Sequence, residues 1–144
     1  MSSPTVRDSI KAAITVLADP WPVFDMSDYN TIDEVLNSIM AEAVLIEYIA
    51  ADDQIQTIGG QGNQGYEETG TAIIHMIVPT GFASSPAVNK GYNIQIGMRG
   101  RRLTPEITIQ SMSPFVDFGS GSIGVNGAVH GFASSLFYVN RNCG

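Results

Sequence analysis

Two apolar stretches flank a polar segment in the middle of the chain. The first covers 42–49 and is apolar on both sets of alternating positions, and the second covers 69–79. Alternate residues of a β-strand point to opposite faces of its sheet, so a strand that is apolar on both faces belongs inside a sheet. The pattern predicts a long antiparallel hairpin over 42–79 whose base lies in the core.

The polar segment 52–68 lies between these strands, and four of its seven residues from 59 to 65 are glycine. Ordering such a segment costs much conformational entropy, and it has little apolar surface to offset that cost. We interpret it as a protruding, flexible interaction arm that becomes ordered against a partner. The arm residues expected to make contacts are Asp52, Asp53, Gln54, Gln56, Gly59, Gly60, Gln61, Asn63, Gln64, Glu67 and Glu68.

The N-terminal residues carry the pattern of an amphipathic helix. Ser3-Pro4 provides an N-cap followed by proline at the first helical position, and apolar residues recur at helical spacing up to Asp19-Pro20. The segment 20–24 cannot continue the helix, because its two prolines lack amide donors. We expect it to run extended, with Trp21 and Phe24 on the core. A capping-box pattern further predicts a short helix over 31–40.

A second main helix is predicted from Ser85-Pro86 to about Arg99, where Gly100 ends it. Val88, Tyr92, Gln95, Ile96 and Met98 recur on this helix at helical spacing. Gly91 and Gly97 weaken it, and they would let another backbone approach closely.

The last third of the chain predicts strands at 106–112, 114–118 and 128–139, with a turn at 119–122. The order of elements is helix, hairpin, helix, hairpin. It predicts an α+β fold, with one mostly antiparallel sheet, two main helices on one face and a long protruding β-hairpin arm.

Length and composition indicate one domain over 1–144, because 144 residues suit one hydrophobic core. No apolar run approaches the roughly 18 residues of a membrane span, and the first residues lack the basic and apolar regions of a secretory signal. We therefore expect a protein that is made and kept in the cytoplasm without a membrane partner. The single Cys143 is expected to be an inert thiol.

Charge is unevenly distributed along the chain. The net charge is −7, which argues against binding nucleic acid by phosphate neutralisation. Eleven of the fourteen acidic residues fall between residues 12 and 89, where there is no lysine or arginine. Both charge blocks could be solvated faces. The alternative is a head-to-tail contact between subunits that closes a ring, which we favour. The subunit contact would then use Lys90, Arg99, Arg101 and Arg102.

Residues that could support catalysis are sparse, so we expect no enzyme, cofactor or metal. The chain has no HExxH, CxxC, GxSxG or phosphate-binding loop ending in Lys-Ser or Lys-Thr. His75 and His130 each lie in an apolar stretch, where an isolated histidine is usually structural. A small hydrolase using His75 or His130 remains the distant alternative.

The predicted elements follow one order over nearly the whole chain: an N-terminal helix before Trp21-Pro22-Val23-Phe24, a strand entering a polar arm, a return strand over 70–79, a central helix and a closing hairpin near 137–140. This layout resembles the tail-terminator (tail-completion) proteins of long-tailed bacteriophages. The predicted helix at 31–40 and the glycines at 91 and 97 depart from the family's pattern.

The resemblance implies a structural virion protein of the neck, assembled in the host cytoplasm. Such a protein forms a homohexameric ring at the head-proximal end of the tail tube, stops tube polymerisation and provides the surface for head-tail joining. Its partners would be the tail-tube protein and a head-closure or connector protein, and DNA would pass through the ring without specific binding. A tail-tube or head-closure protein is the alternative within the same class.

Overall fold

The computed structural model describes residues 4–28, 41–57, 65–79, 83–119 and 129–143. Ser3, the helix expected at 31–40, the turn at 120–122 and the predicted contact residues Gly59, Gly60, Gln61, Asn63 and Gln64 lie outside them. The elements are α1 (Pro4–Ala18), β1 (Val23–Asp25), the 3-10 helix η1 (Met26–Asp28), β2 (Ala43–Thr57), β3 (Gly65–Pro79), α3 (Ser85–Met98), β4 (Ile107–Met112), β5 (Val116–Gly119) and β6 (Val129–Cys143).

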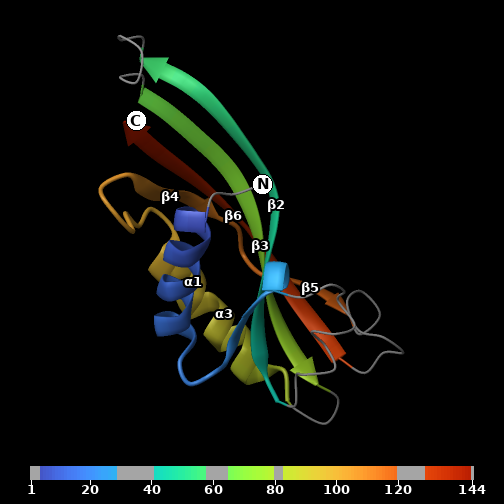
Figure 1. The fold of residues 1–144 in the computed structure, drawn as a ribbon. Helices are drawn as coiled ribbons and strands as arrows, with labels where there is room; N and C mark the ends of the chain where they lie inside the picture. The colour runs from blue at the N-terminus through green and yellow to red at the C-terminus, as the bar shows by residue number, and fades with distance from the viewer. Residues whose placement is uncertain (1–3, 29–40, 58–64, 80–82, 120–128, 144) are drawn as a thin grey trace.

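One six-stranded sheet forms the body of the fold, in the order β1-β2-β3-β6-β4, with β5 also paired to β6. Among the described strands, only the pairing of β1 with β2 is parallel, and the other four pairings are antiparallel. Figure 1 shows α1 and α3 side by side on one face of this sheet. The predicted α+β class, with a mostly antiparallel sheet and two main helices on one face, is therefore confirmed.

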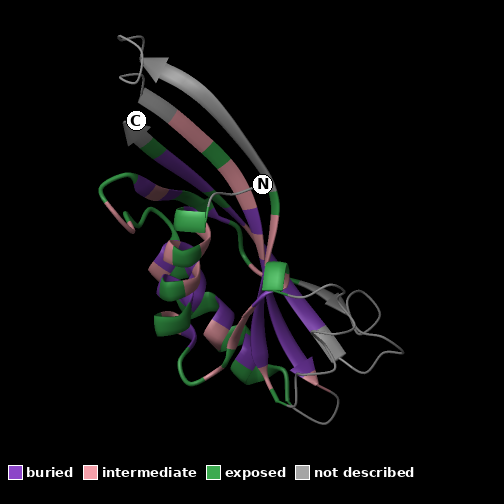
Figure 2. Cartoon of the chain, viewed as in Figure 1, coloured by how far each residue is buried: buried purple, intermediate pink, exposed green. Residues whose placement is uncertain are grey.

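The core lies between the two helices and the sheet. α1 buries Val6, Ile10 and Ile14 at the spacing that its sequence predicts. These side chains pack in one cluster with inward-facing strand residues such as Ile74 and Met76. Figure 2 shows the buried positions concentrated where the helices meet the sheet. Apolar burial at this junction supplies the main stabilisation of the fold.

The segment after α1 turns sharply and then joins the sheet. The Asp19-Pro20 peptide bond is cis, and the Trp21 amide donates to the Ala18 carbonyl at 2.8 Å. β1 then pairs with β2, and Trp21 and Val23 pack against the core. Phe24 is half-buried and pairs in register with Leu45, on the face of the sheet away from the helices.

The upper half of the sheet extends beyond the helices as three strands (Figure 1). β2 pairs with β3 as far as Thr57 and Gly65, and β3 pairs with β6 along its whole length, up to Gly65 and Cys143. The predicted two-stranded protruding arm is not confirmed. The sequence pattern ends the last strand at Val139, but β6 continues to Cys143 because β3 offers its backbone a continuous hydrogen-bonding partner.

The two glycines of α3 allow close contacts with side chains. A Cβ atom on Gly97 would lie 2.7 Å from Leu17 Cδ2, and one on Gly91 would lie 3.0 Å from the Phe115 ring. Glycine thus lets α3 approach α1 near its C-terminal end and Phe115 near its middle. The close approach expected at these positions is present, with side chains and not a backbone as the neighbours.

Candidate assembly surfaces

The outer side of α3 carries an exposed apolar stripe, formed by Val88, Tyr92 and Ile96 and called here the helix stripe. These residues are spaced four apart, so they lie along one side of the helix. Their side chains are between 42% and 62% exposed. The inward side instead buries Ala87, Gly91, Ile94, Gln95 and Met98. The residues that recur at helical spacing in the sequence are therefore divided between the two sides, with Gln95 and Met98 buried and the helix stripe exposed.

A pocket of about 240 Å³ opens beside the helix stripe. Gln95 lies at the pocket, and its side-chain amide donates to the Met112 carbonyl at 3.2 Å, which fixes the chain where β4 ends. Pro114 then separates β4 from β5 along the edge of β6. The lining residues are Val88, Tyr92, Gln95, Pro114, Phe115 and Phe132, so the pocket is mainly apolar.

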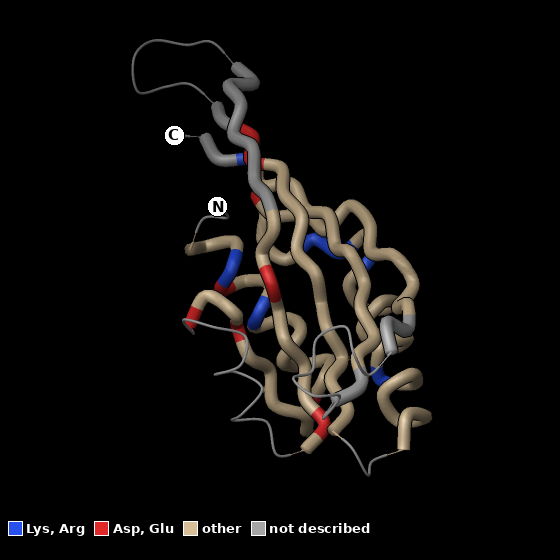
Figure 3. The backbone as a smooth tube through the Cα atoms, turned by 90° about the vertical axis from the view of Figure 1, so that its right-hand side faces the viewer, with Lys and Arg blue, Asp and Glu red and all other residues tan. Residues whose placement is uncertain are grey.

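The face of the sheet away from the helices, called the far face, carries a second exposed apolar region. A β-bulge sets Ile49 and Ala50 opposite Thr71, and Thr71 pairs with Phe137 on its other side. Ile49 is 53% exposed and Phe137 is 43% exposed. Ile73 is half-buried two residues along β3 on the same face. Ile49, Ile73 and Phe137 are called the sheet patch, and Figure 3 shows the molecule with the far face of the sheet towards the viewer.

The structure separates the predicted basic contact residues into two groups. Arg99, Arg101 and Arg102 are exposed together just after α3, where Gly100 has a φ of 71° and ends the helix. Lys90 lies about two and a half turns earlier on α3. Its Nζ donates to the Asp19 carbonyl at 3.0 Å and lies 5.8 Å from the centre of the Trp21 ring. Lys90 therefore contacts its own subunit.

Two predicted arm acids also make contacts within the subunit. Arg141 Nε donates to Glu67 Oε2 at 3.1 Å, and the buried Tyr138 hydroxyl donates to Glu68 Oε2 at 2.6 Å. Asp52, Asp53, Gln54 and Gln56 lie in the outer half of β2, where the first three pair in register with Thr69, Glu68 and Glu67 of β3.

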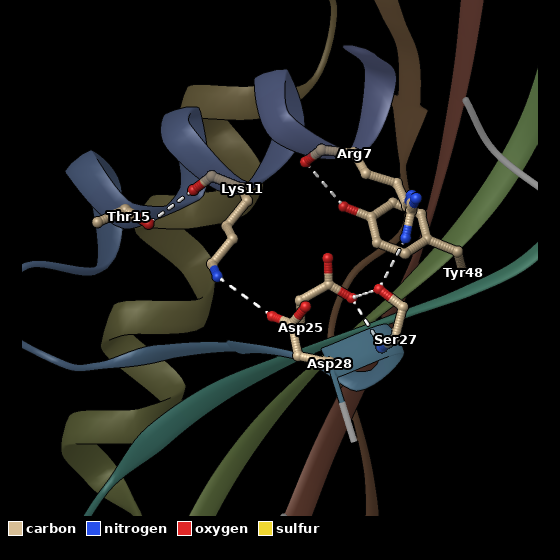
Figure 4. Close-up of polar contacts among 7 residues, drawn as sticks. All are labelled: Arg7, Lys11, Thr15, Asp25, Ser27, Asp28 and Tyr48. Atoms are coloured by element: carbon tan, nitrogen blue, oxygen red, sulfur yellow. Dashed lines mark hydrogen bonds and ion pairs between the residues drawn. The ribbon is translucent and has the colours of Figure 1, made fainter. Parts of the chain in front are cut away.

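Part of the acidic block is paired with α1 (Figure 4). The Ser27 amide and hydroxyl donate to the buried Asp25 carboxylate at 2.9 Å and 2.6 Å. Arg7 in turn donates to the Ser27 hydroxyl at 2.9 Å, and Lys11 forms an ion pair with Asp28 at 3.7 Å. These contacts help to hold η1 against α1, with Asp25 buried and Asp28 exposed. The i, i+4 spacing of Arg7 and Lys11 is the sequence signal for this cluster.

Tyr48 connects the same cluster to β2. Its hydroxyl donates to the Arg7 carbonyl at 3.1 Å. Burial, with a further contribution from the Asp25 carboxylate, raises the pKa of Tyr48. The hydroxyl therefore stays protonated and remains a donor. This bond fixes the N-terminal turn of α1 over the point where the sheet extends beyond the helices.

His75 is a buried strand residue. It is 8% exposed and pairs in register with Leu45 and Ala133. Burial lowers its pKa to about 4, so the imidazole is neutral near pH 7. Its apolar neighbours in register favour a structural histidine over a catalytic one. In the described parts of the chain, no group of three or more His, Cys, Asp or Glu residues could hold a metal ion.

Comparisons with known proteins bear on the fold alone. The chain is similar to a solved protein structure with a TM-score of 0.53 and 16% sequence identity, and the alignment covers 99% of this chain and 96% of that one. No model of a protein family matches the chain, and no curated protein matches it. Among the described helices, none is long and apolar enough to cross a membrane. The whole-chain alignment supports one α+β architecture.

Proposed function

We propose that this protein is a ring-forming tail terminator of a long-tailed bacteriophage. In this role it is a structural virion protein of the neck and not an enzyme. Its subunits, six in the ring that the family resemblance implies, bind the head-proximal end of the tail tube and stop its polymerisation. The ring then provides the surface to which a head-closure or connector protein joins.

The observation that carries this proposal is the three-stranded extension of β2, β3 and β6 beyond the helices (Figure 1). The residues of β2 in this extension are mostly polar in sequence, including Asp52, Asp53, Gln54 and Gln56. Polar strands that continue past a core gain little from apolar burial within one subunit. A neighbouring subunit or a tube end would stabilise them, and this agrees with the arm that the family resemblance implies.

The charge of the chain is compatible with a ring that surrounds DNA. A net charge of −7 on each subunit disfavours tight contact with phosphates. DNA would then pass through the ring without specific binding. This function needs no ligand or metal, because it depends on contacts between proteins.

The test is a polymerisation assay with the tail-tube protein of the same phage. Tubes are grown with and without this protein, more tube protein is added, and tube lengths are measured by electron microscopy. A terminator keeps the length distribution fixed after the addition. Tubes that continue to elongate contradict the proposal. Unlimited tubes formed by this protein alone would indicate a tube protein, and binding to a portal or adaptor without tails would indicate a head-closure protein.

A further inference from the structure

Within the proposed ring, and resting on that function, we infer that the helix stripe of one subunit binds the sheet patch of a second copy. Val88, Tyr92 and Ile96 of one subunit contact Ile49, Ile73 and Phe137 of the next. The partner of both surfaces is therefore this chain itself, in a head-to-tail contact.

α3 carries apolar residues on its outer side as well as on its inner side. Its buried side carries Ile94 and Met98 together with Gly91 and Gln95, and its exposed side carries further apolar residues, including Tyr92, which is 62% exposed. A helix that needed only its own core would have a polar outer side. Exposed aromatic and aliphatic residues on one side of a helix are typical of a binding surface.

The sheet patch is a suitable surface for the helix stripe of another copy. One face of an antiparallel sheet commonly packs against helices, and α1 and α3 cover only the near face of this sheet. A helix from another copy can lie on the uncovered part of the far face. Phe137 is a large exposed side chain of the patch, and the apolar pocket beside Tyr92 offers a place for it. An aromatic side chain anchored in a pocket is the usual centre of a protein interface.

The helix stripe and the sheet patch lie on different sides of the subunit. The helix stripe belongs to the helical layer and the sheet patch to the opposite side of the sheet. A contact between two different surfaces is heterologous, so each subunit can bind one neighbour on each side. Repetition closes a ring when the rotation permits. This is the geometry that a terminator requires.

Charge agrees with the same pairing. The exposed Arg99, Arg101 and Arg102 follow the C-terminal end of the helix stripe. Glu47 lies on the far face beside Ile73, with which it pairs in register. Opposite charges at the rims of two apolar surfaces favour association and fix its direction. The basic cluster is thus placed to meet the next subunit, as the charge distribution predicts.

The experiment uses two variants of the full chain, Tyr92→Asp and Phe137→Asp, each disabling one surface. Analytical ultracentrifugation measures association over a range of concentrations. Each variant alone should lower the association constant at least about 30-fold, as expected when an anchoring aromatic residue is lost. The control is Val16→Asp, an exposed apolar residue of α1 that is 72% exposed and belongs to neither surface. It should associate like the wild type.

Mixing the two variants gives the decisive measurement. Tyr92→Asp retains an intact sheet patch and Phe137→Asp retains an intact helix stripe, so a 1:1 mixture should form a heterodimer through the one remaining contact. A mixture that stays monomeric overturns the inference. If circular dichroism shows that Phe137→Asp is unfolded, Phe137→Thr replaces it, because threonine suits a strand.

Other outcomes also decide the question. A wild-type chain that is monomeric at every concentration overturns the inference, as does an oligomer that survives both substitutions. In the latter case the tube-length assay on the wild type still judges the proposed function separately. A termination-competent protein with unaffected oligomers would form its ring through other surfaces.

Discussion

The two main helices lie on the same face of the sheet but differ in the side chains that they bury and expose. α1 buries Val6, Ile10 and Ile14. α3 buries Ile94 and Met98 together with an alanine, a glycine and a glutamine, and it exposes Val88, Tyr92 and Ile96. The small inward residues let α3 lie close to Leu17 and Phe115. α1 thus stabilises the subunit by apolar burial, whereas α3 combines close packing on its inner side with an exposed apolar stripe on its outer side.

The largest expected effect is on α1. Ile10→Ala removes a fully buried side chain from the core, and the free energy of unfolding should fall by about 2 to 5 kcal/mol. Chemical denaturation with a circular dichroism signal measures this loss. A loss below about 1 kcal/mol would show that apolar burial by α1 is not a main source of the stability of the subunit.

The stability contributed by His75, which lies on the far face, should depend on pH. The pKa of His75 is about 4 in the folded protein and near 6.5 in an unfolded chain, so the unfolded chain binds more protons between these values. Stability is therefore complete above about pH 6.5 and falls as the pH drops towards 4. The loss from this group is roughly 3 kcal/mol over that range.

Denaturation at several pH values tests the contribution of His75. The difference in stability between the wild type and His75→Gln should shrink or reverse on going from pH 7 to pH 4, because glutamine does not titrate. Ile10→Ala serves as the control, since its loss should be similar at both pH values. An unchanged difference for His75→Gln contradicts the buried neutral histidine.

An intermediate effect is expected where the two helices meet. Gly97→Ala places a methyl group 2.7 Å from Leu17 Cδ2, so Leu17 must move. Overpacking of this kind costs about 1 to 3 kcal/mol, although alanine favours the helix by up to about 1 kcal/mol. Thermal unfolding should show a net loss of stability.

A second variant separates the crowding from the helix preference. In a Leu17→Ala background the crowding is relieved, and Gly97→Ala should then be neutral or stabilising. The same cost in both backgrounds would show that Gly97 is not needed for the contact between α1 and α3.

The smallest effect is expected on the outer side of α3. Ile96→Ala should change the free energy of unfolding by no more than about 0.5 kcal/mol, because the side chain is exposed in one subunit. The measurement is made at a concentration where the chain is monomeric by ultracentrifugation. A loss comparable with that of Ile10→Ala would show that Ile96 contributes to the core of one subunit as Ile10 does. It would contradict the difference drawn between the outer side of α3 and the buried side of α1.

The fold class, the two main helices and the inner parts of the strands can be predicted from the sequence. The proline signals and helical spacing predicted α1 and α3 close to their observed bounds, because caps and apolar periodicity are local properties. The strands over 42–49, 69–79 and 106–112 were predicted for the same reason. The candidate basic cluster Arg99, Arg101 and Arg102 was also identifiable, since it follows a helix that ends at a glycine.

The tertiary structure alone decided how these elements contact one another. β6 pairs with β3 on one edge and with β4 and β5 on the other, so the expected hairpin became part of a three-stranded extension. Long-range pairing also gave Glu67 and Glu68 partners in Arg141 and Tyr138, more than 65 residues away in the chain. Gly91 and Gly97 lie against Phe115 and Leu17, where an added Cβ would be crowded, and the tertiary structure alone shows these contacts. Sequence periodicity records which residues share a side of an element, but the side that is buried depends on the shape of its neighbours.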